Sequence, residues 1–192
     1  AVGQGTSLKT LTLADSNGAV FNAAVTTGTS VVLTDTTDGQ TIRFEGNLST
    51  PTLSTTANGY NVELLGSATN VSSATTFLNS GTLVLGNGSG DSLSFAGGLV
   101  ATAPAAISAA GTISTNGTVM SLGDASTPLT LSGDLTLNTA GGALTLGGTV
   151  NGSNANTESL TLNAASGGAI SVVGAVGQGT SLKTLTLADS NG

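Results

Sequence analysis

The stretch AVGQGTSLKTLTLADSNG, Ala1–Gly18, returns without a change as Ala175–Gly192. Ala175 therefore stands at the same point of a cycle as Ala1. The chain holds one full repeat, residues 1–174, and the start of an identical repeat, residues 175–192. Exact self-similarity at a fixed period is the sequence signature of repeat architectures. Because neither end carries a starting Met, a signal peptide or a cap, we expect an excerpt from a longer tandem array.

The centre of the repeated stretch has the pattern of a half-buried β-strand. Leu11 and Leu13 alternate with Thr10 and Thr12, and a period of two places the two kinds of side chain on opposite faces. The Asn17-Gly18 pair that follows is typical of a tight turn. The same Leu-Thr-Leu motif occurs at 129–131, 135–137, 144–146, 160–162 and 185–187.

Apolar alternation of this kind recurs at intervals of about 10 or 20 residues, which indicates an all-β chain of many short strands. Pro104 interrupts the Ala-rich segment Leu99–Ala110, so we expect this segment to be the least regular part. Sandwich, closed-barrel and propeller folds are alternatives, but each of them needs a domain that begins and ends. The uncapped repeat favours a parallel β-solenoid of about nine coils of roughly 20 residues per repeat, with Leu, Val, Ile and Phe inside and Thr outside.

Composition excludes several classes of protein. Charged residues make up 7% of the chain, the net charge is −7, and Cys and His are both absent. Nucleic-acid binding requires a basic surface, and the only cations are Arg43 and the equivalent pair Lys9 and Lys183. No apolar run approaches the roughly 18 residues of a membrane helix, so we expect no membrane insertion in this segment.

Three segments resemble the repeats of filamentous-haemagglutinin-like giant bacterial surface proteins and their autotransporter relatives. They are Gly5–Asp35, Leu144–Gly152 and Ser159–Gly177. The shared feature is a pattern of Leu-Thr-Leu strands and Gly-rich corners. The resemblance implies a secreted protein with a long right-handed parallel β-helix that forms an extracellular fibre or adhesin stalk. It implies no catalytic residues and no cofactor.

The acidic residues give the only candidate site. The loop before Leu93, GNGSGD, ends in Asp91 and partly matches a calcium β-roll loop, and Asp35 and Asp38 share one predicted turn. We therefore name Asp35, Asp38 and Asp91 as candidate calcium ligands, although ordinary turn chemistry explains them better. Without His or Cys, the usual nucleophile and base pairs are missing, so we expect no enzyme.

Two functional hypotheses follow. The first is a structural, non-catalytic segment of a long secreted repeat protein on the bacterial surface, whose partners are its own tandem copies and laterally packed fibres. The second is a ligand-binding β-helix module on the cell surface that holds a glycan, calcium or ice. Outward Thr suits ice binding, but the uneven strand spacing argues against the flat, regular array that ice binding needs. Surface glycans of a host or a neighbouring cell are the external partners we expect.

Overall fold

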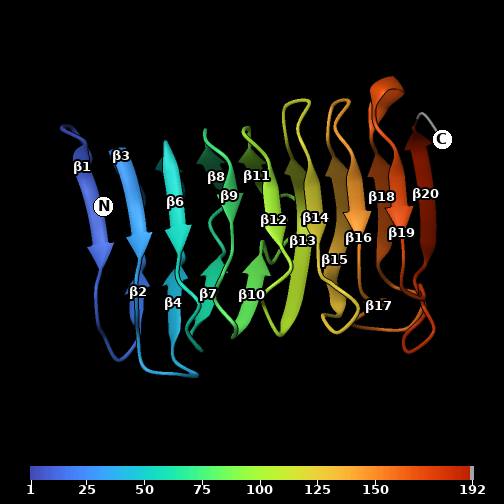
Figure 1. Cartoon of the computed structure of the whole chain (residues 1–192), viewed down its shortest axis with the longest axis horizontal. Helices are drawn as coiled ribbons and strands as arrows, with labels where there is room; N and C mark the ends of the chain where they lie inside the picture. Colours follow the sequence, from blue (N-terminus) through green and yellow to red (C-terminus); the bar gives the residue numbers. More distant parts are fainter. Residues whose placement is uncertain (191–192) are drawn as a thin grey trace.

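The computed structural model describes residues 1–190. Within them the chain is all-β apart from one short 3₁₀ helix, η1 (Ala165–Gly167). Its coils are stacked along one long axis from the N-terminal to the C-terminal end (Figure 1). The chain is a parallel β-solenoid of about eight turns, which confirms the predicted fold. Asn191 and Gly192, the predicted turn at the end of the second copy, lie outside the described residues.

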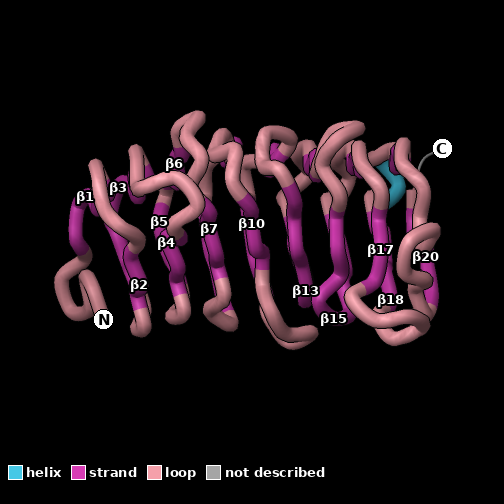
Figure 2. Tube along the Cα trace, turned by 90° about the horizontal axis from the view of Figure 1, so that it is seen from below, coloured by secondary structure: helices cyan, strands magenta, loops and turns pink. Residues whose placement is uncertain are grey.

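Each coil contributes to three parallel strand ladders, which we call ladders I, II and III in the order in which the chain meets them. Ladder I contains Val2, the first half of β3 (Val25–Leu33), β5 (Leu48–Thr50), β8 (Ala68–Val71), β11 (Ser92–Phe95), the second halves of β13 (Ala106–Ser114) and β15 (Leu129–Asn138), β18 (Ser159–Asn163) and β20 (Thr184–Asp189). Ladder II contains β1 (Leu8–Leu13), the second half of β3, β6 (Thr52–Thr55), β9 (Thr75–Thr76), β12 (Leu99–Ala101), β14 (Met120–Leu122), β16 (Leu144–Leu146) and β19 (Ile170–Val172). Within ladder II, β6 and β9 stack in contact without paired residues, so the ladder is interrupted there. Ladder III contains β2 (Ala19–Phe21), β4 (Thr41–Phe44), β7 (Asn61–Leu64), β10 (Thr82–Leu85), the first halves of β13 and β15, β17 (Val150–Gly152) and Val176. The stacked strands can be followed from the side in Figure 2.

The coils are longer and more variable than predicted. A short coil runs from Leu11 to its ladder partner Val31, whereas a long one runs from Val150 to its partner Val176. Residues 1–174 therefore make between seven and eight coils rather than nine. The predicted value assumed about 20 residues per coil, whereas each coil has three strands and the corners between them differ in length.

The interior is a continuous apolar core, as the alternating pattern predicts. The inward residues of each strand stack on inward residues of the next coil, as Ile42 does on Val62 and Val62 does on Leu83. Near the N-terminal end the rings of Phe21 and Phe44 stack with centroids 4.9 Å apart. Burial of each such side chain contributes roughly 1.5–3 kcal/mol, so the core accounts for much of the stability of the solenoid.

Threonine does not always point outward. Nine threonines are buried: Thr27, Thr36, Thr50, Thr55, Thr69, Thr75, Thr115, Thr127 and Thr139. Several satisfy their hydroxyls inside the solenoid, as Thr27 does by donating to the Thr50 hydroxyl at 2.7 Å. A buried hydroxyl costs free energy unless it finds a partner. Most of the buried threonines accordingly lie where a corner carbonyl or a second hydroxyl is within reach.

The segment Leu99–Ala110 is regular, contrary to the expectation drawn from Pro104. It supplies β12 and the start of β13, one of the longest strands. Pro104 lies in the corner between them, where it interrupts no ladder, and its carbonyl accepts a hydrogen bond from the Thr127 hydroxyl at 2.8 Å. Because proline lacks an N–H donor but keeps its carbonyl, a corner accommodates it at no cost to the sheet.

Candidate functional site

The repeated stretch is the first candidate site, because its two copies occupy different places on the solenoid. In the first copy Val2 bridges to Val25 on ladder I, and β1 pairs with the second half of β3 on ladder II. In the second copy Val176 bridges to Val150 on ladder III, and β20 pairs with β18 on ladder I. Each element of the second copy therefore lies one ladder earlier than its counterpart. The repeat, residues 1–174, makes seven coils and two thirds of the next.

The change of ladder preserves which side chains face inward. Leu11 and Leu13 pair with the buried Val31 and Leu33, and their counterparts Leu185 and Leu187 pair with the buried Leu160 and Leu162. Val2 and Val176 likewise pair with buried valines. A slip of one residue would turn every leucine of the strand toward solvent. The repeated stretch thus fits two ladders equally well because both present inward apolar residues at the same register.

The second copy is also held by specific polar contacts. The Asn151 side-chain oxygen accepts hydrogen bonds from the backbone N–H groups of Gly179 at 2.8 Å and Thr180 at 3.1 Å. Asn156 donates its N–H to the Ser181 carbonyl and accepts from the Ser181 hydroxyl through its side-chain oxygen. The loop of the second copy that precedes β20 is therefore docked on β17 and on the corner between β17 and β18.

Large apolar side chains are exposed on the first and last coils. On the last coils they are Val172, Val173, Leu185 and Leu187, and near the N-terminal end they are Leu8 and Val20. Leu187 is 58% exposed, whereas its counterpart Leu13 is 9% exposed. Both side chains point toward the core. Leu13 is covered because its strand pairs with β3 of the following coil, whereas the strand of Leu187 pairs with β18 of the preceding coil. Leu78 and Val119 are the large exposed apolar side chains between these ends. At the ends of a solenoid, exposed apolar side chains on inward-facing positions are suited to contact with a further coil.

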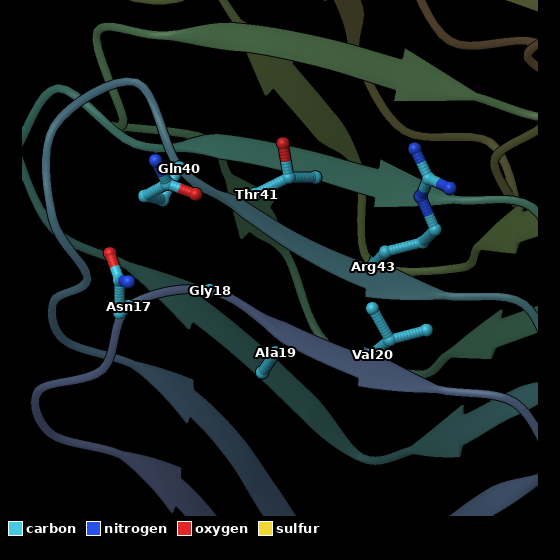
Figure 3. A pocket seen from close by; sticks show the side chains of 7 residues that line it. All are labelled: Asn17, Gly18, Ala19, Val20, Gln40, Thr41 and Arg43. Atoms are coloured by element: carbon cyan, nitrogen blue, oxygen red, sulfur yellow. The ribbon is translucent and has the colours of Figure 1, made fainter.

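A shallow open hollow lies beside β2, at the N-terminal edge of ladder III (Figure 3). Its lining residues are Asn17, Gly18, Ala19, Val20, Gln40, Thr41 and Arg43. Among the strands that the structure describes, β2 pairs only with β4. The hollow lies over the paired strands β2 and β4, whereas the opposite edge of β2 carries backbone groups that another strand can pair with.

Arg43 is engaged in a local ion-pair network on the outer face of ladder III. Its Nε donates to Glu63 Oε2 at 2.5 Å, and its Nη1 lies 3.3 Å from Glu45 Oε1. The hydrogen bond and the charge of Glu63 raise the pKa of Arg43 above its ordinary value. Since both partners are partly exposed, such a pair contributes about 0–1 kcal/mol. The guanidinium is already paired, so it is not a free anion-binding group.

The structure does not bring the three predicted calcium ligands together. The Asp91 carboxylate accepts hydrogen bonds from the backbone N–H groups of Asn87 and Gly88, both at 2.9 Å, within the corner between β10 and β11. Asp38 lies in the corner between β3 and β4 and accepts from Gly59 N–H at 3.0 Å. Asp35 lies in that same corner. Over residues 1–190 there is no group of three or more acidic, His or Cys side chains placed to hold a metal ion.

Glu158 is a buried carboxylate that the sequence pattern did not single out. Its oxygens accept from the Ser153 hydroxyl at 2.7 Å and from the Asn154 backbone N–H at 3.2 Å. These hydrogen bonds, led by that of Ser153, lower the pKa of Glu158. The same arrangement lowers the pKa of Asp124, which accepts from Ser126 and Thr127. Each carboxylate accepts hydrogen bonds from residues of its own corner. Neither is therefore placed as a free acid for catalysis.

Comparison with protein-family models, curated proteins and solved structures gave no match. Within residues 1–190 no helix has the length and apolar character needed to cross a bilayer. The main feature is therefore the solenoid itself, in which the second copy of the repeated stretch stacks on the end of the first repeat.

Proposed function

We propose that this chain is a structural, non-catalytic segment of a long secreted repeat protein that forms an extracellular filament or adhesin stalk. The observation that carries the proposal is the pairing of the second copy with the first repeat: Leu187 stacks on Leu162 in the same ladder register that joins the coils within the repeat. A repeat whose end receives its own beginning extends a fibre by each copy added.

The outer surface supports the same proposal. Ladder I carries an unbroken outward row of hydroxyl residues, namely Ser92, Thr112, Thr136, Thr161 and Thr186. These side chains are uncharged, so this row itself adds no charge repulsion between neighbouring fibres. We expect the filament to work through its length, its stiffness and its lateral packing.

Electron microscopy of proteins with one, two and four tandem copies tests the proposal. Coils stack at about 4.8 Å, so each added copy should lengthen a single continuous rod by about 37 Å. X-ray diffraction from oriented fibres should also give a meridional reflection at about 4.8 Å from the stacked coils. Copies that fold as separate bodies joined by linkers would refute the filament. Antibody labelling of intact producing cells tests the extracellular location, and labelling only after lysis would refute it.

A further inference from the structure

We infer that successive copies of the repeat join with a step of one ladder, so that the fibre returns to its starting orientation only after three copies. Ladder I of one copy continues into ladder II of the next, ladder II into ladder III, and ladder III into ladder I. This inference rests on the proposed tandem filament and specifies how its subunits meet. The partner is a second copy of this same chain.

Two of the three joins are visible within the chain. β18 on ladder I receives β20, which is the second copy of the ladder II strand β1. Val150 in β17 on ladder III receives Val176, the second copy of the ladder I residue Val2. Both joins shift in the same direction by one ladder. Because the copies are identical in sequence, the shift arises from the length of the repeat and not from a local difference.

The third join can be completed from the strands at the two ends. β19 turns Ile170 toward the core beside Leu144, and β2 turns Ala19 and Phe21 toward the core. Ala19 of the next copy would follow Ile170 of this copy along the chain. The number of residues between them lies between the length of the short coil, Leu11–Val31, and that of the long coil, Val150–Val176.

This spacing aligns the two strands residue by residue. Ala19 of the next copy pairs with Ile170, Val20 with Ser171 and Phe21 with Val172. Phe21 of the next copy then covers Val172, which is 36% exposed at the end of this chain. The third join therefore buries apolar surface that the single chain leaves open.

The free edge of β2 is suited to this join. β2 carries Val20, which is 57% exposed on the outer face beside the hollow of Figure 3. Addition of β19 from the preceding copy satisfies the backbone groups of this edge, which is how exposed strand edges are normally protected. Val20 then lies beside Ser171 on the outer face.

The one-ladder step distributes surface features around the fibre. Three copies contain about 23 coils, so the full period is about 110 Å at a coil spacing of about 4.8 Å. The Arg43–Glu63 ion pair, which lies on ladder III of one copy, appears on each face in turn. The fibre therefore presents this ion pair on all three faces.

Disulfide trapping in a protein with one added repeat tests the step, because the chain has no cysteine of its own. Directly paired parallel strands lie about 4.8 Å apart, within the Cα separation that a disulfide spans. The first variant combines Ser171→Cys in the first copy with Val20→Cys in the second, and reports the one-ladder step. The second combines Ser171→Cys with Thr186→Cys, which is Thr12 of the second copy, and reports an in-phase join in which β1 follows β19. The Thr161→Cys, Thr186→Cys variant is the positive control, since these residues are paired in the chain.

We expect a disulfide in the first variant and in the control, and none in the second variant. A disulfide in the second variant would overturn the one-ladder step. A disulfide in the control without one in the first variant would overturn the third join, and with it the three-copy period. Electron microscopy of the same two-copy protein distinguishes the two failures. A continuous rod without the Ser171–Val20 disulfide refutes only the step, whereas two separate bodies refute the proposed filament as well.

Discussion

Leu13 and Leu187 are the same residue of the repeat, yet they lie on different ladders, because Leu13 pairs with Leu33 on ladder II and Leu187 pairs with Leu162 on ladder I. Both face inward. The sequence of the strand therefore determines which side chains are buried, while the chain length before it determines where on the solenoid the strand lies. This separation lets one repeat sequence stack on three different faces.

Leu13 and Leu187 lie in the same local sequence but at two different places on the solenoid, so substituting each one compares the two places directly. In the 192-residue chain, Leu13→Ala should lower the free energy of unfolding by about 2 kcal/mol, the lower end for a buried leucine. Leu187→Ala should cost less than about 1 kcal/mol, because much of that side chain already contacts water. Urea denaturation measures both. Equal losses would contradict the different burial of the two copies.

Substitution of Tyr60 should also lower the stability, because this side chain is fully buried and its hydroxyl forms hydrogen bonds with two backbone groups. The hydroxyl donates to the Leu33 carbonyl at 2.7 Å and accepts from Thr56 N–H at 3.0 Å. Tyr60→Phe leaves both groups without this partner, at an expected cost of about 1–3 kcal/mol.

The control for Tyr60→Phe is Ser108→Ala, which removes a hydroxyl from the outer face of ladder III and should change stability by less than about 0.5 kcal/mol. Thermal unfolding followed by circular dichroism measures both variants. A Tyr60→Phe protein as stable as the Ser108→Ala protein would show that water replaces the lost hydroxyl.

The sequence predicts the fold class and most Leu-rich strands, but it misses the short strands with polar inward residues. β8 and β9 place Thr69 and Thr75 in the interior, where the pattern alone assigns threonine to the surface. Their burial depends on neighbours one coil away, which are distant in the chain and invisible to a local pattern.

Calcium binding by Asp35, Asp38 or Asp91 stays a prediction, and the sequence could not show how these carboxylates are engaged. Asp38 and Asp91 each satisfy backbone N–H groups of their own or an adjacent corner, and a sequence motif does not reveal whether a carboxylate is already engaged. The exact repeat was visible in the sequence, but the one-ladder shift between its copies was not. That shift depends on the sum of many unequal coil lengths. A small error in the predicted length of each coil is enough to hide it.

Corner glycines should differ sharply in their tolerance of alanine. A Cβ at Gly148 would lie 1.9 Å from the Thr127 carbonyl oxygen of the preceding coil, whereas a Cβ at Gly90 meets nothing within 4 Å. Gly148→Ala must push two coils apart, and overpacking of this kind costs about 1–3 kcal/mol.

Gly90→Ala is the matched control and should be close to neutral or slightly stabilising, since alanine reduces the freedom of the unfolded chain. The melting temperatures of the two variants compare the sites directly. A Gly90→Ala protein less stable than Gly148→Ala would contradict the close approach of the coils at Gly148.

Acid should weaken the solenoid in part through Glu158. The pKa of this carboxyl is lowered in the folded chain by the hydrogen bonds from Ser153 and Asn154. A lowered pKa means that its stabilisation is fully present above the unfolded value of about 4.3 and is lost as the pH falls through the folded value. Glu158→Gln should therefore be less stable than the parent chain at pH 6, and the two melting temperatures should converge as the pH falls below the pKa of Glu158 in the folded chain. Parallel curves over this range would exclude Glu158 as a source of the acid dependence.

Asn151 should control how firmly the second copy is seated on the first repeat. Its side-chain oxygen accepts from the N–H groups of Gly179 and Thr180, and it lies on β17 beside the join. Asn151→Ala removes this acceptor, so both amides should exchange with solvent about tenfold faster, which corresponds to about 1.4 kcal/mol of lost local stability. Asn70→Ala, an exposed asparagine on ladder I, is the control and should leave these amides unchanged. Hydrogen exchange read by NMR resolves the individual amides, and unchanged protection of Gly179 and Thr180 in Asn151→Ala would show that strand pairing between β18 and β20 is sufficient to hold the second copy.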